Sequence, residues 1–132
     1  MDVSDNNRAE QYKDEVRERW GGTAAYAEYA AKAESDPAAL KDAAAGMERL
    51  MDAFAACMQG GAAPDSAQAQ TLVQNLQAYI TAHFYTCTDE ILAGLGQMYT
   101  ADERFRRNLD QRAPGTAAFI SAAIKNAETA DR

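Results

Sequence analysis

The residues best suited to chemistry lie around His83, the single histidine of the chain. Cys87 follows four residues later, and on a continuous helix the two side chains would share a face as a base and a nucleophile. The sequence predicts a helix break near Tyr85, however, and a break there spoils this register. A catalytic triad also requires a carboxylate that orients the histidine. We therefore interpret His83 as a partly buried histidine near a structural thiol, and we expect no enzymatic activity.

The same stretch is a poor candidate for a zinc site. Zinc would need His83, Cys87 and two further ligands, for which Asp89 and Glu90 are the nearest candidates. Adjacent residues of a helix point in different directions, so these two carboxylates cannot easily converge on one ion. The chain also lacks the Glu-x-x-His pairs of a di-iron bundle and the glycine-rich loop that cradles phosphates. We expect neither a metal nor a cofactor.

Length and charge narrow the function classes further. The chain has 132 residues, which fits one domain, a formal net charge of -7 and an isoelectric point near 4.6. Phosphate backbones and anionic membranes attract basic surfaces, so we expect no direct nucleic-acid contact and no membrane contact. The two cysteines, Cys57 and Cys87, lack metal-type spacing, and a short secreted chain would usually carry more. We interpret them as reduced thiols of a cytoplasmic protein.

Apolar residues recur at helical spacing along the whole chain, and frequent alanine pairs favour helices. The sequence predicts an all-α domain of about six to seven helices. These helices are expected over 8–20, from Thr23 to Asp36, from Pro37 to about Gln59, from Pro64-Asp65 to near Tyr85, through Ile91 to Tyr99, from Thr100 to Pro114, and from Gly115 onward. Asp65 with Gln68 and Thr100 with Glu103 are the predicted capping pairs.

The strength of these patterns divides the domain, which spans residues 1–132, into three parts. Residues 1–7 are polar and expected to fray. Residues 8–36 contain few large aliphatic side chains, so we expect these N-terminal helices to be held loosely. Residues 37–129 are expected to form the helical core.

Many of the larger side chains are methionine, tyrosine or tryptophan, in a chain that is otherwise rich in alanine. Tyrosine and tryptophan suit sites that are apolar with a polar edge, and methionine adapts to varied shapes. Ordinary core packing explains the same residues, but the number of amphipathic aromatics favours a cleft over a dry core. Gly94 and Gly96 lie inside a predicted helix, where each costs about 1 kcal/mol relative to alanine. Either close helix packing or room for a ligand would offset that cost.

Three segments carry a family resemblance. They read QYKDEVRERWGGTAAY at 11–26, HFYTCTDEILAGLGQMYTADERF at 83–105 and NLDQRAPGTAAFISAAIKNA at 108–127. The ordered motifs RWG, FY-x-C, LG-x-MY, D-x-RF and APG resemble those of TipAS-type antibiotic-recognition domains, over nearly the whole chain. The resemblance implies a globin-like helical domain that binds thiopeptides or other large, aromatic, peptide-like antibiotics in a long apolar cleft. Its N-terminal helices can be mobile without ligand and close over it.

The resemblance also implies a role in regulation. Such domains commonly form the C-terminal effector half of MerR-type transcription regulators, and some act alone by sequestering the drug. No helix-turn-helix or coiled coil precedes Tyr12, so we expect either an excised effector domain or a standalone member. Any dimerisation or DNA binding is expected to reside in a missing N-terminal region.

The resemblance assigns the ligand site to apolar and aromatic side chains. Trp20, Tyr26 and Tyr29 are expected to form a mobile wall, and the rest of the site is expected to be lined by Met47, Met51, Phe54, His83, Tyr85, Gly94, Leu95, Met98 and Tyr99. In thiopeptide-binding members, a cysteine seven residues after the motif cysteine captures a dehydroalanine of the drug. That position is Gly94 here, so we expect reversible, non-covalent binding.

Two other functions compete with antibiotic recognition. The groove could receive a helix of a partner protein, as in helix-in-groove recognition. A haem-type sensor is the second alternative, suggested by the globin-like architecture, with His83 as the proximal ligand. Fold analogy alone supports the haem alternative, and such analogy is a weak guide to function.

Overall fold

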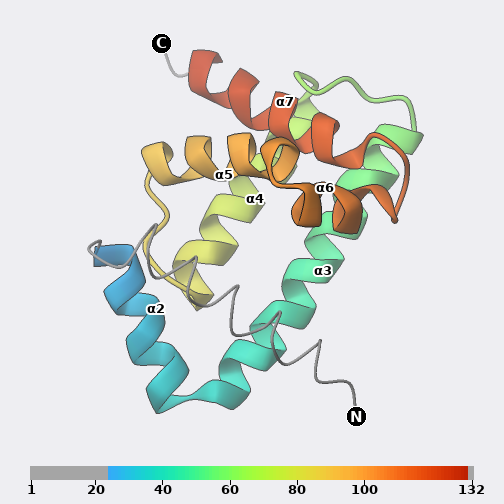
Figure 1. Cartoon of the computed structure of the whole chain (residues 1–132). Helices are drawn as coiled ribbons and strands as arrows, with labels where there is room; N and C mark the ends of the chain where they lie inside the picture. Colours follow the sequence, from blue (N-terminus) through green and yellow to red (C-terminus); the bar gives the residue numbers. More distant parts are fainter. Residues whose placement is uncertain (1–23, 131–132) are drawn as a thin grey trace.

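The structure is a computed structural model that describes residues 24–130, and these residues form six α-helices and no strand. The helices are α2 (Ala24–Ser35), α3 (Pro37–Gln59), α4 (Ala67–His83), α5 (Asp89–Ala101), α6 (Glu103–Asp110) and α7 (Thr116–Ala130) (Figure 1). The all-α prediction is confirmed. The helix predicted over residues 8–20, together with Trp20, lies outside the described residues. Within residues 24–130, no helix is both long and apolar enough to cross a membrane.

Helix α3 begins and ends at the residues that the sequence predicts. The Asp36 carboxylate accepts a hydrogen bond from the Ala39 amide at 3.1 Å, and Pro37 occupies the first turn. At the other end Gly60 caps the helix, and Gly61 adopts a φ of 90°, which favours glycine. These signals are local in the sequence, which is why they predict the helix ends correctly.

Two predicted caps are wrong by one or two residues. Helix α4 is capped by Ser66 instead of Asp65, since the Ser66 hydroxyl accepts from the Ala69 amide at 3.2 Å. Asp65 lies one residue earlier, inside a turn that the Ser66 amide closes on the Ala63 carbonyl. Helix α6 is capped by Asp102, whose carboxylate accepts from the Arg104 amide at 3.0 Å.

Thr100, the other predicted cap, stays within α5. Its hydroxyl donates to the carbonyl of Gln97 at 3.2 Å, so it is not available to the amides of α6. Helix α5 therefore continues to Ala101, and the sixth helix begins later than the T-x-x-E pattern indicates. The sixth helix also ends at Asp110, before the predicted Pro114 boundary.

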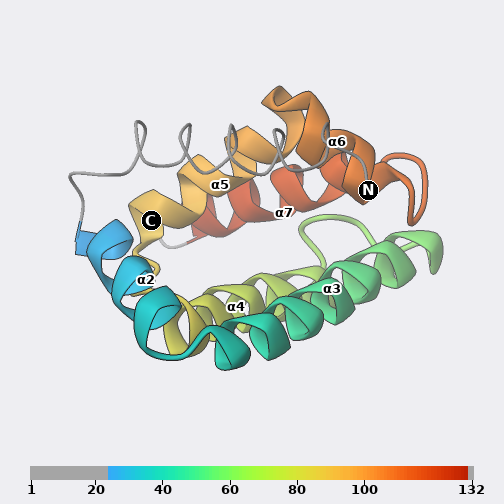
Figure 2. The ribbon, with the colours of Figure 1, turned by 60° about the horizontal axis from the view of Figure 1, so that its bottom comes forward.

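The helices pack in two layers. Figure 2 shows α3 and α4 side by side in one layer, with α5, α6 and α7 in the other and α2 at one end. The core lies between the layers, where Phe54 of α3, Leu76 of α4, and Ile120 and Ile124 of α7 are at most 1% exposed. This arrangement gives the domain one continuous apolar core, against which the candidate site residues can be placed.

Close helix packing explains one of the two glycines of α5. A Cβ atom on Gly96 would lie 3.1 Å from Cγ2 and 3.2 Å from Cβ of Ile124, which is almost fully buried in α7. Glycine at this position therefore lets α5 and α7 approach closely. The sequence leaves two explanations open for this glycine, close helix packing and room for a ligand, and the contact with Ile124 supports close packing.

Candidate functional site

Most of the predicted site residues meet in one apolar cluster. Met51, Phe54, Leu95 and Tyr99 belong to the buried core, with exposures of 5%, 0%, 8% and 6%. They come from α3 and α5, which lie in opposite layers (Figure 2). Phe54 has no exposed surface, so within the described structure it shapes the core beneath the site.

Three other predicted residues form the edge of this cluster. Met47 on α3, Tyr85 in the loop between α4 and α5, and Met98 on α5 are half-buried and pack against the core. These side chains combine contact with the core and partial exposure to solvent. An apolar ligand that bound there would exchange partial exposure for burial, which favours binding by about 25 cal/mol per Å² of apolar surface.

Helix α2 carries the two described residues of the predicted mobile wall. Tyr26 is half-buried, and Tyr29 is the most exposed large apolar side chain of the described residues, at 38%. Among the described side chains of α2, none is buried, and its main helix contacts are with α3, the helix that follows it in the chain. The exposed tyrosine on a lightly packed helix is available to a ligand. Trp20, the third residue of this wall, lies outside the described residues.

His83 is placed differently from our interpretation of it as partly buried. It ends α4 with an exposed side chain, and its ring lies against that of Tyr79, with centroids 4.3 Å apart. The interpretation is wrong because the last turn of α4 extends past the buried residues, of which Ile80 is the last in that helix. In this position the imidazole is directed to solvent, which is unsuitable for a proximal haem ligand in an apolar pocket.

The loop between α4 and α5 is held by side chains of α4. The Thr81 hydroxyl accepts from the Cys87 amide at 3.1 Å. Gln77 donates through Nε2 to the Cys87 carbonyl and to the Asp89 carboxylate, both at 2.9 Å. Neither residue is predicted from the sequence, because polar side chains on a helix surface give no periodic signal. They fix the segment that carries Tyr85.

The thiol of Cys87 is unsuited to chemistry. Its side chain is 4% exposed, and burial raises its pKa to about 11, with a smaller contribution from the nearby charge of Asp89. The thiol is therefore protonated near neutral pH, while nucleophiles and metal ligands need the thiolate. In the part of the chain that is described, no group of three His, Cys, Asp or Glu side chains could hold a metal ion.

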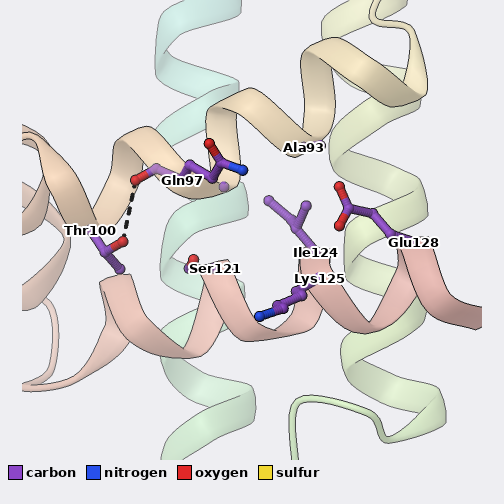
Figure 3. A pocket seen from close by; sticks show the side chains of 8 residues that line it. Ala93, Gln97, Thr100, Ser121, Ile124, Lys125 and Glu128 are labelled. Carbon is purple, nitrogen blue, oxygen red and sulfur yellow. Dashed lines mark hydrogen bonds between the residues drawn. The ribbon is translucent and has the colours of Figure 1, made fainter.

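A hollow of about 270 Å³ lies elsewhere, between α5 and α7. In Figure 3 its rim consists of polar side chains, with Gln97 and Thr100 on α5 facing Ser121, Lys125 and Glu128 on α7. Ala93, Gly96 and Ile124 complete its lining. None of the predicted site residues lines it. Gly94, the neighbour of Ala93 on α5, is half-buried.

A close contact between α3 and α4 is also not predicted from the sequence. The Tyr79 hydroxyl donates to the Ala43 carbonyl at 2.7 Å, and its ring lies directly over Gly46. Any side chain at residue 46 would overlap the tyrosine. A glycine within the long apolar stripe of α3 was the available signal, although it does not indicate which residue fills the space.

The fold and the site define a class of protein: a small helical domain whose core reaches the surface at aromatic and methionine side chains, suited to binding apolar ligands. The chain belongs to the TipAS family, because the model of the TipAS antibiotic-recognition domain matches residues 12–127. The resemblance in the sequence is thereby confirmed.

The chain is also similar to transcription activators. It is 39% identical over 119 residues to the HTH-type transcriptional activator TipA of Streptomyces coelicolor. The aligned region covers 87% of this chain and 46% of the activator. It is 35% identical over 118 residues to the HTH-type transcriptional activator Mta of Bacillus subtilis, covering 86% of this chain and 43% of Mta. The chain thus spans less than half the length of these relatives.

Two solved structures are similar to the fold. The first is nosiheptide in complex with TipAS, from a thiopeptide antibiotic multidrug resistance system of Streptomyces lividans. It has a TM-score of 0.80 and 36% identity, covering 93% of this chain and 87% of that one. The second, the antibiotic binding domain of a TipA-class multidrug resistance transcriptional regulator, has a TM-score of 0.60 and 34% identity, covering 65% and 92%.

Proposed function

We propose that this chain recognises bulky, apolar, peptide-like antibiotics without a covalent bond, using the apolar cluster and its tyrosine-bearing edge. The observation that carries the proposal is the similarity of 93% of this chain to a TipAS chain in complex with nosiheptide. Met47, Tyr85 and Met98 support it, because they are half-buried residues at the margin of one core. Met98 and Met47 can adapt to an irregular ligand, and Tyr85 can combine apolar contact with a hydrogen bond.

Shape and apolar contact would dominate the affinity. The side chains that we assign to the site include no Asp, Glu, Lys or Arg, and the one histidine among them, His83, lies exposed at its margin. A ligand without strong charges therefore fits this surface better than an anionic one, and the net charge of -7 also disfavours anions. Neither the site nor the buried Cys87 thiol offers a nucleophile, so we propose binding without catalysis.

The absence of a thiol at residue 94 is what makes the proposed binding reversible. With Gly94, this chain has no cysteine at the position where thiopeptide-binding relatives are expected to capture the drug. Gly94→Cys should restore capture: its S–H would add across the dehydroalanine double bond, forming an S–C bond and transferring the proton to the α-carbon. Intact-mass measurement after incubation with nosiheptide should show an adduct of one ligand mass on this variant alone.

The same measurement tests the assignment of the site. Wild-type protein should bind nosiheptide in a titration yet show no adduct, and Gln97→Cys, on the hollow-lining face of α5, should remain unmodified. Equal labelling of the two variants would place the ligand elsewhere. An adduct on wild-type protein would contradict reversible binding.

The biological role that we propose follows from the similar activators. We propose that the domain is the ligand-sensing part of an HTH-type regulator in the cytoplasm, or a protein that sequesters the drug by itself. In either case DNA contact would come from another region, because the acidic surface of this chain repels phosphate backbones. Titration of the chain with a promoter-length duplex should therefore give no binding at physiological salt.

A further inference from the structure

Helix α2 is joined to a distant loop by one carboxylate. Oε2 of Glu28 accepts hydrogen bonds from the Thr86 amide at 2.9 Å and from the Thr86 hydroxyl at 3.1 Å. The two residues are separated by 58 positions in the sequence, so this contact is purely tertiary. Thr86 lies directly between Tyr85 and Cys87 in the loop from α4 to α5.

The loop is therefore held from two directions. Thr81 and Gln77 bind it at Cys87 from α4, the helix that immediately precedes it. Glu28 binds it at Thr86 from α2, which is remote in sequence. Because α4 is firmly packed in the core, Thr81 and Gln77 keep the loop near α4 regardless of α2. The Glu28 contact depends on the position of α2, and α2 contributes no buried side chain among those described.

We propose that Glu28 is a positioning residue that fixes α2 against the 84–88 loop. Helix α2 carries Tyr26 and Tyr29, and the loop carries Tyr85, so the carboxylate sets how far apart these parts of the site lie. The inference rests on the proposed function where the ligand is concerned, but the positioning itself can be measured without a ligand. An element with few buried apolar contacts opens easily, so a single charge-assisted hydrogen bond has a measurable influence on it.

The experiment is amide hydrogen exchange by NMR on the full chain, without ligand, comparing Glu28→Ala with Glu34→Ala. Glu34 is the matched control, because it is an exposed glutamate of the same helix whose side chain has no hydrogen-bond or ion-pair partner among the described residues. In Glu28→Ala, the Thr86 amide and the amides of α2 should exchange about five-fold faster, the ratio that one net hydrogen bond provides. Glu28→Gln should be intermediate, because its amide oxygen still accepts hydrogen bonds but carries no charge. Amides of α5 and α7 should be unchanged, which would establish that the fold is intact.

Equal exchange in Glu28→Ala and Glu34→Ala would overturn the inference. A nosiheptide titration then separates it from the proposed function. If Glu28 positions the site, Glu28→Ala should bind nosiheptide more weakly, through faster dissociation, while Glu34→Ala should bind it as wild-type protein does. An unchanged affinity of Glu28→Ala, despite faster amide exchange, would refute a role of Glu28 in positioning the site. If wild-type protein binds no nosiheptide, the proposed function fails, and the exchange result still decides whether Glu28 holds α2.

Discussion

The contact between Gly46 and Tyr79 gives the sharpest prediction about packing in this domain. A methyl group at residue 46 would overlap the Tyr79 hydroxyl and lie 2.7 Å from Cζ of the ring. The ring cannot yield freely, because its hydroxyl donates to the Ala43 carbonyl at 2.7 Å, and its centroid lies 4.3 Å from that of His83 and 6.2 Å from that of Phe84. Gly46→Ala must therefore displace the tyrosine and break that hydrogen bond.

The expected magnitude follows from three effects. The lost hydrogen bond costs about 1 kcal/mol, and forcing extra volume into a packed contact costs about 1–3 kcal/mol. Alanine in a helix interior returns about 1 kcal/mol relative to glycine. The free energy of unfolding should therefore fall by about 1–3 kcal/mol, although the substitution favours helix formation.

Urea denaturation followed by far-UV circular dichroism measures this change, and two further variants sharpen it. Ala45→Gly, on the exposed face of α3, calibrates helix propensity in the same helix. In a Tyr79→Ala background the clash is absent, so Gly46→Ala should now stabilise the chain by up to about 1 kcal/mol. A stabilising or neutral effect of Gly46→Ala with Tyr79 present would show that the ring does not oppose a side chain at residue 46, as would a change of the same sign in both backgrounds.

Four other predictions concern an ion pair, a thiol and a helix. Arg112 is 13% exposed and pairs with Glu48 and Asp52 of α3, so Arg112→Ala should cost about 1–2 kcal/mol in urea denaturation. Arg107 is 72% exposed, so Arg107→Ala should lower the free energy of unfolding by less than about 0.5 kcal/mol. Equal losses of stability in Arg112→Ala and Arg107→Ala would contradict the structure. Buried Cys87 should resist alkylation at pH 8 while half-exposed Cys57 reacts, and comparable rates in mass spectrometry would count against burial. Because the pKa of Cys87 is raised from 9.0 to about 11 in the folded chain, the unfolded thiol ionises first, and the free energy of unfolding should decrease from pH 9.0 to about 11. Amides of α2 should exchange more slowly with nosiheptide than without it, whereas equal protection in both states would exclude ordering on binding.

The sequence predicts the helices well because their signals are local. Asp36 and Pro37 define the start of α3, and Gly60 and Gly61 define its end, so each signal comes from neighbouring residues. The predicted caps Asp65 and Thr100 are wrong, and Ser66 and Asp102 cap these helices instead, because several neighbouring residues can accept a hydrogen bond from the first amides and the loop geometry decides which one does so.

The site is harder to predict, because apolar residues at helical spacing form the same sequence pattern whether they pack in the core or line a groove. Met47 and Phe54 follow one helical pattern, yet Met47 is half-buried and Phe54 has no exposure. Contacts between residues that are distant in the chain give no signal in a single sequence. Examples are the packing of Gly96 against Ile124 and the hydrogen bond from the Thr86 amide to Glu28. The periodicity of apolar residues predicts an apolar surface but not its ligand, whereas the family resemblance indicates a class of ligand.

Non-covalent antibiotic recognition is tested most directly by an NMR titration of the isotopically labelled chain with nosiheptide, followed by dialysis. Amide shifts should be concentrated in α2 and in residues 83–99, with full recovery of the free spectrum once the ligand is removed. Residues lining the hollow from α7, such as Ser121 and Lys125, should shift little. No shift in the 83–99 segment, or shifts that persist after dialysis, would contradict it.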